Sequence, residues 1–103
     1  MSERKFDNQR DLFIYIWINR KHYSEVSGEY LGEEPRAHYF SHVIGKGAYP
    51  SFKLREDNIV LMTIEEHEQW GNRRWEIKND PKWRRVFELE ERLIQEHNKK
   101  ALA

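Results

Sequence analysis

The stretch HYFSHVIGKG, residues 38 to 47, places two histidines four positions apart, directly before a turn of glycine and lysine. An imidazole accepts or releases a proton near neutral pH, and its neutral form also binds metal ions. It is costly to bury without a partner, so a packed core is a poor explanation for this composition. An asparagine, Asn58, and another histidine, His67, follow later in the chain. These residues predict a polar site suited to acid–base or metal chemistry.

The segments around these residues predict two short strands followed by a helix. Residues 37–44, AHYFSHVI, are rich in strand-forming side chains, and alternation places His38 on the same strand face as His42. Residues 58–63, NIVLMT, form a second strand-like run. A threonine followed three positions later by glutamate is a capping-box pattern, and it predicts a helix over residues 64–70.

Helices are predicted on both sides of this region, which makes the fold class α+β. Asp7 or Asn8 can cap a first helix, although the β-branched and aromatic run 13–18 leaves a strand as the alternative. Asp80 followed by Pro81 predicts the start of a long helix that ends near residue 97. We expect three tryptophans to be buried against the first helix: Trp70, Trp75 and Trp83.

The order His42, Asn58, His67 on a strand, a second strand and a helix resembles the HNH endonucleases, whose ββα-metal fold encloses one divalent ion. The matching text is SHVIGKGAYP, REDNIVLM and EEH. It is similar to that of small HNH-related proteins of bacteriophages and prophages. The resemblance covers about residues 22–70, and it implies an HNH-like core, a short β-hairpin plus a helix, within a single domain of residues 1–103.

The resemblance also implies a role for each matching residue. His42 would be the general base that deprotonates the water attacking a phosphodiester, and Asn58 would hold the loop that orients it. His67 would be a ligand to a divalent ion, Mg²⁺, Mn²⁺ or Zn²⁺, which stabilises the leaving oxygen. Lys46 in the turn would contact phosphate as a point charge. The implied substrate is DNA, with RNA as the second possibility.

The sequence departs from the HNH pattern at the metal site. Active members commonly carry Asp or His directly before the general base, whereas this chain carries Ser41, a poor ligand at neutral pH. Many relatives also carry zinc-binding cysteines, and this chain has none. His38 or Glu66 would have to replace the missing ligand, so the candidate ligands are His67, Ser41, His38 and Glu66. As an alternative, the glutamates beside His67 would raise its pKa and keep it a charged surface residue.

Charge is balanced over the whole chain but unevenly distributed. Lysine and arginine number 18, as do aspartate and glutamate, so the formal net charge is zero. Residues 25–34 carry four glutamates and no basic residue, whereas residues 73–85 carry six basic residues against two acidic ones. We predict that five of these basic residues join Lys46 in contacting nucleic acid: Arg73, Arg74, Lys82, Arg84 and Arg85. The alternative is that they are solvated or paired with neighbouring carboxylates.

Composition predicts no membrane segment, because no apolar run approaches the roughly 20 residues that cross a bilayer. The lack of cysteine is compatible with a reducing compartment, so we expect a cytoplasmic protein, in the host cell if a phage encodes it.

Three functions are consistent with these patterns. The first is a small HNH-like nuclease that hydrolyses phosphodiesters with a divalent metal ion. The second is a catalytically degenerate module of the same fold that binds DNA or RNA. The third is a phage protein whose aromatic surface serves an interaction with another protein, and the zero net charge favours it over nonspecific DNA binding.

Overall fold

The computed structural model describes residues 5–102, and these form an α+β fold of three helices and a two-stranded antiparallel hairpin. The helices and strands are α1 (Gln9–Asn19), β1 (Phe40–His42), β2 (Ile59–Leu61), α2 (Ile64–Asn72) and α3 (Arg84–Leu102). Short 3₁₀ turns complete the path: η1 (Ala37–Tyr39), η2 (Pro50–Phe52), η3 (Glu56–Asn58), η4 (Arg74–Glu76) and η5 (Pro81–Trp83). The order β1, β2, α2 agrees with the predicted succession of strand, strand and helix.

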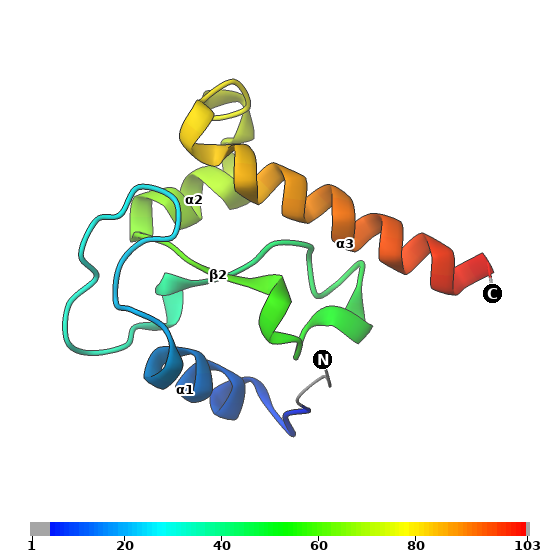
Figure 1. Ribbon diagram of the computed structural model, residues 1–103, viewed down its shortest axis with the longest axis horizontal. Helices are drawn as coiled ribbons and strands as arrows, with labels where there is room; N and C mark the ends of the chain where they lie inside the picture. Colours follow the sequence, from blue (N-terminus) through cyan, green and yellow to red (C-terminus); the bar gives the residue numbers. More distant parts are fainter. Residues whose placement is uncertain (1–4, 103) are drawn as a thin grey trace.

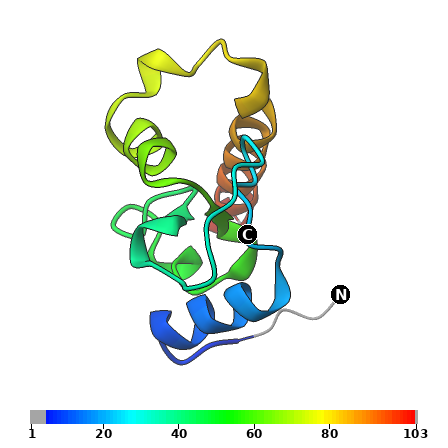
Figure 2. The same cartoon turned by 90° about the vertical axis from the view of Figure 1, so that its left-hand side faces the viewer.

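The hairpin lies between two helical layers, with α1 on one side and α2 and α3 on the other (Figures 1 and 2). Alternate residues of β2 point to opposite faces, so Ile59 and Leu61 pack in a cluster with α1 residues. Val60 and Met62 pack in a second cluster with residues of α2 and α3. Because helices cover both faces, β2 is apolar at every position, which explains its continuous hydrophobic run.

Helix α1 begins at the predicted cap and has the predicted buried face. The Asn8 side chain accepts a hydrogen bond from the Asp11 backbone N–H at 2.9 Å. Leu12, Ile16 and Trp17 are buried at helical spacing. The prediction of a helix is therefore confirmed, and the strand alternative for residues 13–18 is wrong.

Helix α2 begins where its cap predicts, whereas α3 begins three residues after the predicted start, behind a 3₁₀ turn. Thr63 and Glu66 form a reciprocal capping box at the start of α2, which continues through the glycine–asparagine pair expected to end it. Asp80 caps η5, which leads directly into α3. Helix α3 extends to Leu102, past the predicted end near residue 97. No helix within residues 5–102 is both long enough and apolar enough to cross a membrane.

The strand predicted over residues 37–44 is shorter than expected. Only Phe40–His42 pair with β2, and residues 37–39 form the turn η1. His38 therefore lies on an exposed 3₁₀ turn, so its predicted position on one strand face with His42 is wrong. Residues 37–39 form a local turn instead, with hydrogen bonds from Tyr39 N to Arg36 O and from Phe40 N to Ala37 O, although Tyr39 O still accepts from Met62 N at 2.9 Å.

The tryptophans do not gather against α1 as predicted. Trp70 and Trp83 stack with ring centroids 5.9 Å apart in the cluster formed with α3. Trp75 is 66% exposed on η4. Only Trp17 packs in the α1 cluster.

An ion pair between the loop before β2 and α3 makes stability depend on pH. The Arg55 guanidinium contacts the Glu96 carboxylate, and this bond lowers the pKa of Glu96 to about 2. A carboxyl group whose pKa is lowered in the folded protein stabilises the fold fully at pH values above its ordinary pKa of 4.5. This contribution is lost as the pH falls from 4.5 toward about 2.

We therefore expect Glu96→Gln to lower the melting temperature by about 4 °C at pH 7, a modest value because the carboxylate is partly exposed. The difference from the parent should shrink steadily between pH 4.5 and pH 3. Melting curves over this range check it, with Glu88→Gln on an exposed position of α3 as the control. A difference that does not change with pH would contradict the assignment to this ion pair.

Candidate functional site

A pocket of about 360 Å³ lies at the free edge of β1, and we call it the histidine pocket. Residues from four separate segments line it, among them Phe13, Ser41, His42, Lys46, His67 and Gly71. Ser41 and His42 are neighbours in β1, so their side chains leave opposite faces of the hairpin. Ser41 faces α2 and His42 faces α1. The pocket reaches both because β1 has no further strand on its outer side within the described residues.

Ser41 is joined to His67 inside this pocket. The Ser41 Oγ lies 2.7 Å from His67 Nδ1, and Ser41 is only 2% exposed. His67 is on α2, one helical turn after the Thr63 cap, so the position of the cap fixes which face of the helix carries the imidazole. Ser41, which we predicted to be a poor metal ligand, thus hydrogen-bonds to His67, the residue predicted to bind the metal.

The orientation of His42 is fixed by a main-chain carbonyl. Its Nε2 lies 3.0 Å from Lys53 O. A carbonyl oxygen only accepts, so Nε2 carries the hydrogen and Nδ1 of the neutral ring holds the free lone pair. Burial lowers the pKa of His42, and the positive charges of Lys46 and His67 lower it further, while the bond to Lys53 acts in the opposite direction. The neutral, basic form is therefore favoured at neutral pH.

Asn58 holds the loop that supplies this carbonyl. Its side chain is fully buried and makes three hydrogen bonds to main chain: Oδ1 accepts from Ile44 N at 2.8 Å, and Nδ2 donates to Ile44 O at 3.1 Å and to Phe52 O at 3.2 Å. Phe52 directly precedes Lys53, so Asn58 positions the carbonyl that meets His42. No residue other than glycine has a positive φ in the described part of the chain, so Asn58 is not a left-handed turn residue.

The pKa of His67 is lowered, contrary to the alternative drawn from its glutamate neighbours. Burial is the largest cause, and the charge of His38 acts in the same direction. Glu68 raises the pKa but is outweighed. The helix turns the neighbouring glutamates away, and the imidazole is half-buried in the pocket rather than exposed on the surface.

The residues present do not fit a divalent metal ion. Such an ion needs several converging carboxylate, imidazole or thiolate donors. No group of three or more His, Cys, Asp or Glu side chains suited to a metal occurs among residues 5–102. His67 is the one predicted ligand with an imidazole in the pocket, and Ser41 bonds to it. His38 is exposed on η1 and does not line the pocket.

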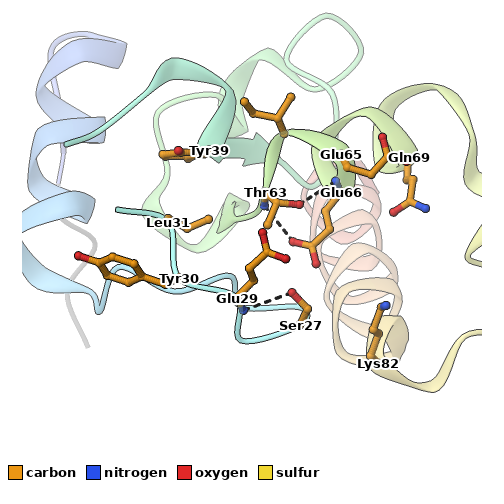
Figure 3. A pocket seen from close by; sticks show the side chains of 11 residues that line it. Ser27, Glu29, Tyr30, Leu31, Tyr39, Thr63, Glu65, Glu66, Gln69 and Lys82 are labelled. Carbon is orange, nitrogen blue, oxygen red and sulfur yellow. Dashed lines mark hydrogen bonds between the residues drawn. The ribbon is translucent and has the colours of Figure 1, made fainter. Parts of the chain in front are cut away.

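Glu66, the remaining predicted ligand, belongs to a different part of the surface. Its carboxylate accepts from Ser24 Oγ at 2.6 Å and from Thr63 N at 2.9 Å, and the residue is 7% exposed. Figure 3 shows it lining a second pocket of about 480 Å³ together with Glu29, Glu65 and Lys82. Adjacent residues on a helix point in directions about 100° apart, which is why Glu66 and His67 serve different pockets.

Three of the six predicted basic contacts lie within 4 Å of a carboxylate. Arg73 lies 2.7 Å from Glu65, and Arg74 pairs with Glu90 while its guanidinium covers the Trp70 ring at 3.6 Å. Three of the remaining residues lie away from the histidine pocket: Lys82, which is 3.7 Å from Asp80, and the exposed Arg84 and Arg85. Only Lys46 among the six lines the histidine pocket. The alternative of paired surface charges therefore describes Arg73 and Arg74 better than a continuous basic face.

Two parts of this arrangement had no signal in the sequence. The Lys53 carbonyl orients His42 through main chain, which residue type does not reveal. The Ser24–Glu66 bond joins positions 42 apart in the chain. Both need tertiary contacts, whereas the caps that position α1 and α2 are local and were readable.

No family model, curated protein or solved structure matches this chain. The site therefore has to be interpreted from its own geometry. That geometry is an α+β fold with two half-buried imidazoles, a hydroxyl and an ammonium group around one pocket.

Proposed function

We infer that this chain is an HNH-like nucleic-acid protein that binds a phosphodiester group in the histidine pocket and presents His42 to it as a general base. The observation that supports this most is that Ser41 and His42 of β1, Lys46 in the turn after β1 and His67 of α2 all line one pocket. The succession β1, β2, α2, with Asn58 buried at the entry to β2, also agrees with the HNH-like pattern.

The pocket has the features that base catalysis on a phosphodiester needs. The Lys53 carbonyl holds His42 in one tautomer, which leaves Nδ1 as the proton acceptor. Asn58 makes that carbonyl rigid by fixing the preceding residue, Phe52. Lys46 supplies positive charge toward the phosphate, and its contact within the protein is a long one of 3.4 Å to Gln9 Oε1.

The second candidate function is binding of DNA or RNA without cleavage. This function is favoured because the side chains around the pocket do not provide the ligands for the divalent ion that HNH enzymes use for cleavage. In this case the same pocket receives phosphate, and His42 serves as a hydrogen-bonding group. The third candidate function is that of a phage or prophage protein that interacts with another protein through exposed apolar residues, of which Trp75 is the largest.

Nicking of supercoiled plasmid separates the first two functions. The parent is incubated with Mg²⁺, Mn²⁺ or Zn²⁺ and compared with His42→Gln, whose amide can still donate to Lys53 O but cannot act as a base. Nicking that disappears in the variant supports His42 as the base. Equal nicking by both proteins contradicts that role, and binding without nicking favours the second function.

Lys46→Ala is expected to weaken binding of a short oligonucleotide about 3- to 10-fold, irrespective of sequence, because one phosphate contact is lost. The slope of log affinity against log salt concentration should decrease by about 1. Fluorescence anisotropy at two or more salt concentrations measures both. Lys78→Ala is the matched control, because Lys78 is exposed and does not line the histidine pocket. Equal loss in both variants would remove the pocket as the phosphate site.

A further inference from the structure

The histidine pocket contains the groups for a reaction that needs no metal ion. It has two imidazoles, His42 and His67, and the ammonium group of Lys46. The metal-donor set is incomplete in the described residues, so metal-dependent hydrolysis lacks its main component. Acid–base catalysis at phosphorus needs only a proton acceptor, a proton donor and a cation.

The two imidazoles have one nitrogen each that is not used for orientation. His42 donates through Nε2 to Lys53 O, which leaves Nδ1 free as an acceptor. His67 is bonded through Nδ1 to the Ser41 hydroxyl, which leaves Nε2. Ser41 can either donate to a neutral ring or accept from a protonated one, because a hydroxyl does both. Each ring is therefore oriented through one nitrogen, and the other nitrogen has no hydrogen-bond partner among the described residues.

RNA differs from DNA in carrying its own nucleophile, the 2′-hydroxyl next to each phosphate. A site that supplies only a base and an acid can therefore cleave RNA but not DNA. The pocket, at about 360 Å³, is within the size range of small-ligand sites and can receive a phosphate with part of its sugars.

We propose that the histidine pocket cleaves RNA by metal-independent transphosphorylation, with His42 as general base and His67 as general acid. His42 Nδ1 takes the proton of the 2′-hydroxyl, and O2′ forms a bond to phosphorus. The P–O5′ bond breaks, and protonated His67 gives its Nε2 proton to O5′. The products are a 2′,3′-cyclic phosphate and a free 5′-hydroxyl. Lys46 balances the charge of the phosphate, and Ser41 is a positioning residue for His67.

This inference rests on the proposed function, since it requires a phosphodiester in the pocket. The test uses the full chain, 10 mM EDTA and a fluorescent RNA oligonucleotide, with the 2′-O-methyl version of the same sequence as the substrate control. We expect cleavage of the RNA only, with 2′,3′-cyclic phosphate ends identified by mass spectrometry. The rate should fall about 100-fold or more in His42→Gln and in His67→Ala. Lys78→Ala, purified in the same way, should cleave like the parent. A contaminating ribonuclease would be present in every preparation, so loss of cleavage in the two histidine variants excludes it.

Other results overturn the inference. Cleavage that requires a metal ion, leaves other ends or also cuts the 2′-O-methyl oligonucleotide assigns a different reaction to the pocket. Binding of RNA with no cleavage in EDTA removes the reaction and leaves the proposed function standing. Failure to bind either nucleic acid removes both the reaction and the proposed function.

The folding of each variant is checked by its melting temperature. Ser41→Ala gives a second measurement: it should reduce the rate less than His67→Ala, because it only frees the imidazole to rotate.

Discussion

Replacing Asn58 with alanine is expected to lower the free energy of unfolding by about 3 kcal/mol. The substitution deletes three hydrogen bonds at a fully buried position and leaves Ile44 N, Ile44 O and Phe52 O without their partner. A buried main-chain group without a partner costs about 1–3 kcal/mol, and partial relaxation of the loop reduces the sum. Urea denaturation monitored by tryptophan fluorescence measures the change.

The matched control is Asn72→Ala at the exposed end of α2. That side chain makes one bond, from Nδ2 to Glu68 Oε1 at 3.0 Å, and its loss should cost no more than about 0.5 kcal/mol. Asn58→Asp should be at least as destabilising as Asn58→Ala, because a carboxylate cannot donate to the two carbonyls and is buried without a cation. A loss below about 1 kcal/mol in Asn58→Ala would mean that the loop is held by other contacts.

Trp83→Ala should destabilise the protein by about 4 kcal/mol, the other large effect that we expect. Trp83 has no solvent exposure and packs in the cluster that attaches α3 to the hairpin. Truncating a buried tryptophan loses its transfer free energy and also leaves a cavity, and this typically costs 3–5 kcal/mol. The melting temperature and the urea midpoint should both fall.

Trp83→Phe distinguishes packing from polarity at the same position. Trp83 Nε1 is buried with no hydrogen-bond partner in the part of the chain that the structure describes. Phenylalanine has no buried N–H without a partner, and this gain offsets part of the packing free energy that the smaller ring loses. We therefore expect the free energy of unfolding to fall by only about 1 kcal/mol. Trp75→Ala, at a 66% exposed position, should change stability by about 0.5 kcal/mol or less. Comparable losses in the phenylalanine and alanine variants would show that Nε1 has a partner, such as a bound water.

Local chemistry in the sequence was sufficient to place the helices. The Asn8 cap, the Thr63–Glu66 capping box and the Asp80–Pro81 start all lie where the structure begins a helix or its leading turn. Such signals act within three or four residues, so they do not depend on the rest of the fold. The order of strand, strand and helix was readable for the same reason, and it already predicted that His42 and His67 would lie on neighbouring elements.

Strand length and the identity of the partner residues depended on tertiary contacts. η1 took residues 37–39 out of the predicted strand, and with them His38. Composition gave no reason to expect that Glu66 would turn to Ser24, or that Lys53 O would meet His42. These contacts form only when the hairpin is packed between α1 and the α2–α3 layer.

By itself, the sequence determined the helix starts, the α+β class and the residue types available for acid–base chemistry. The tertiary structure decided which of those residues meet. It brought His42, Lys46 and His67 to one pocket, tied Ser41 to His67 and directed Glu66 elsewhere. The physical reason is that a cap is satisfied by its own turn, whereas a buried imidazole or carboxylate is satisfied by whichever distant group the packing brings within about 3 Å.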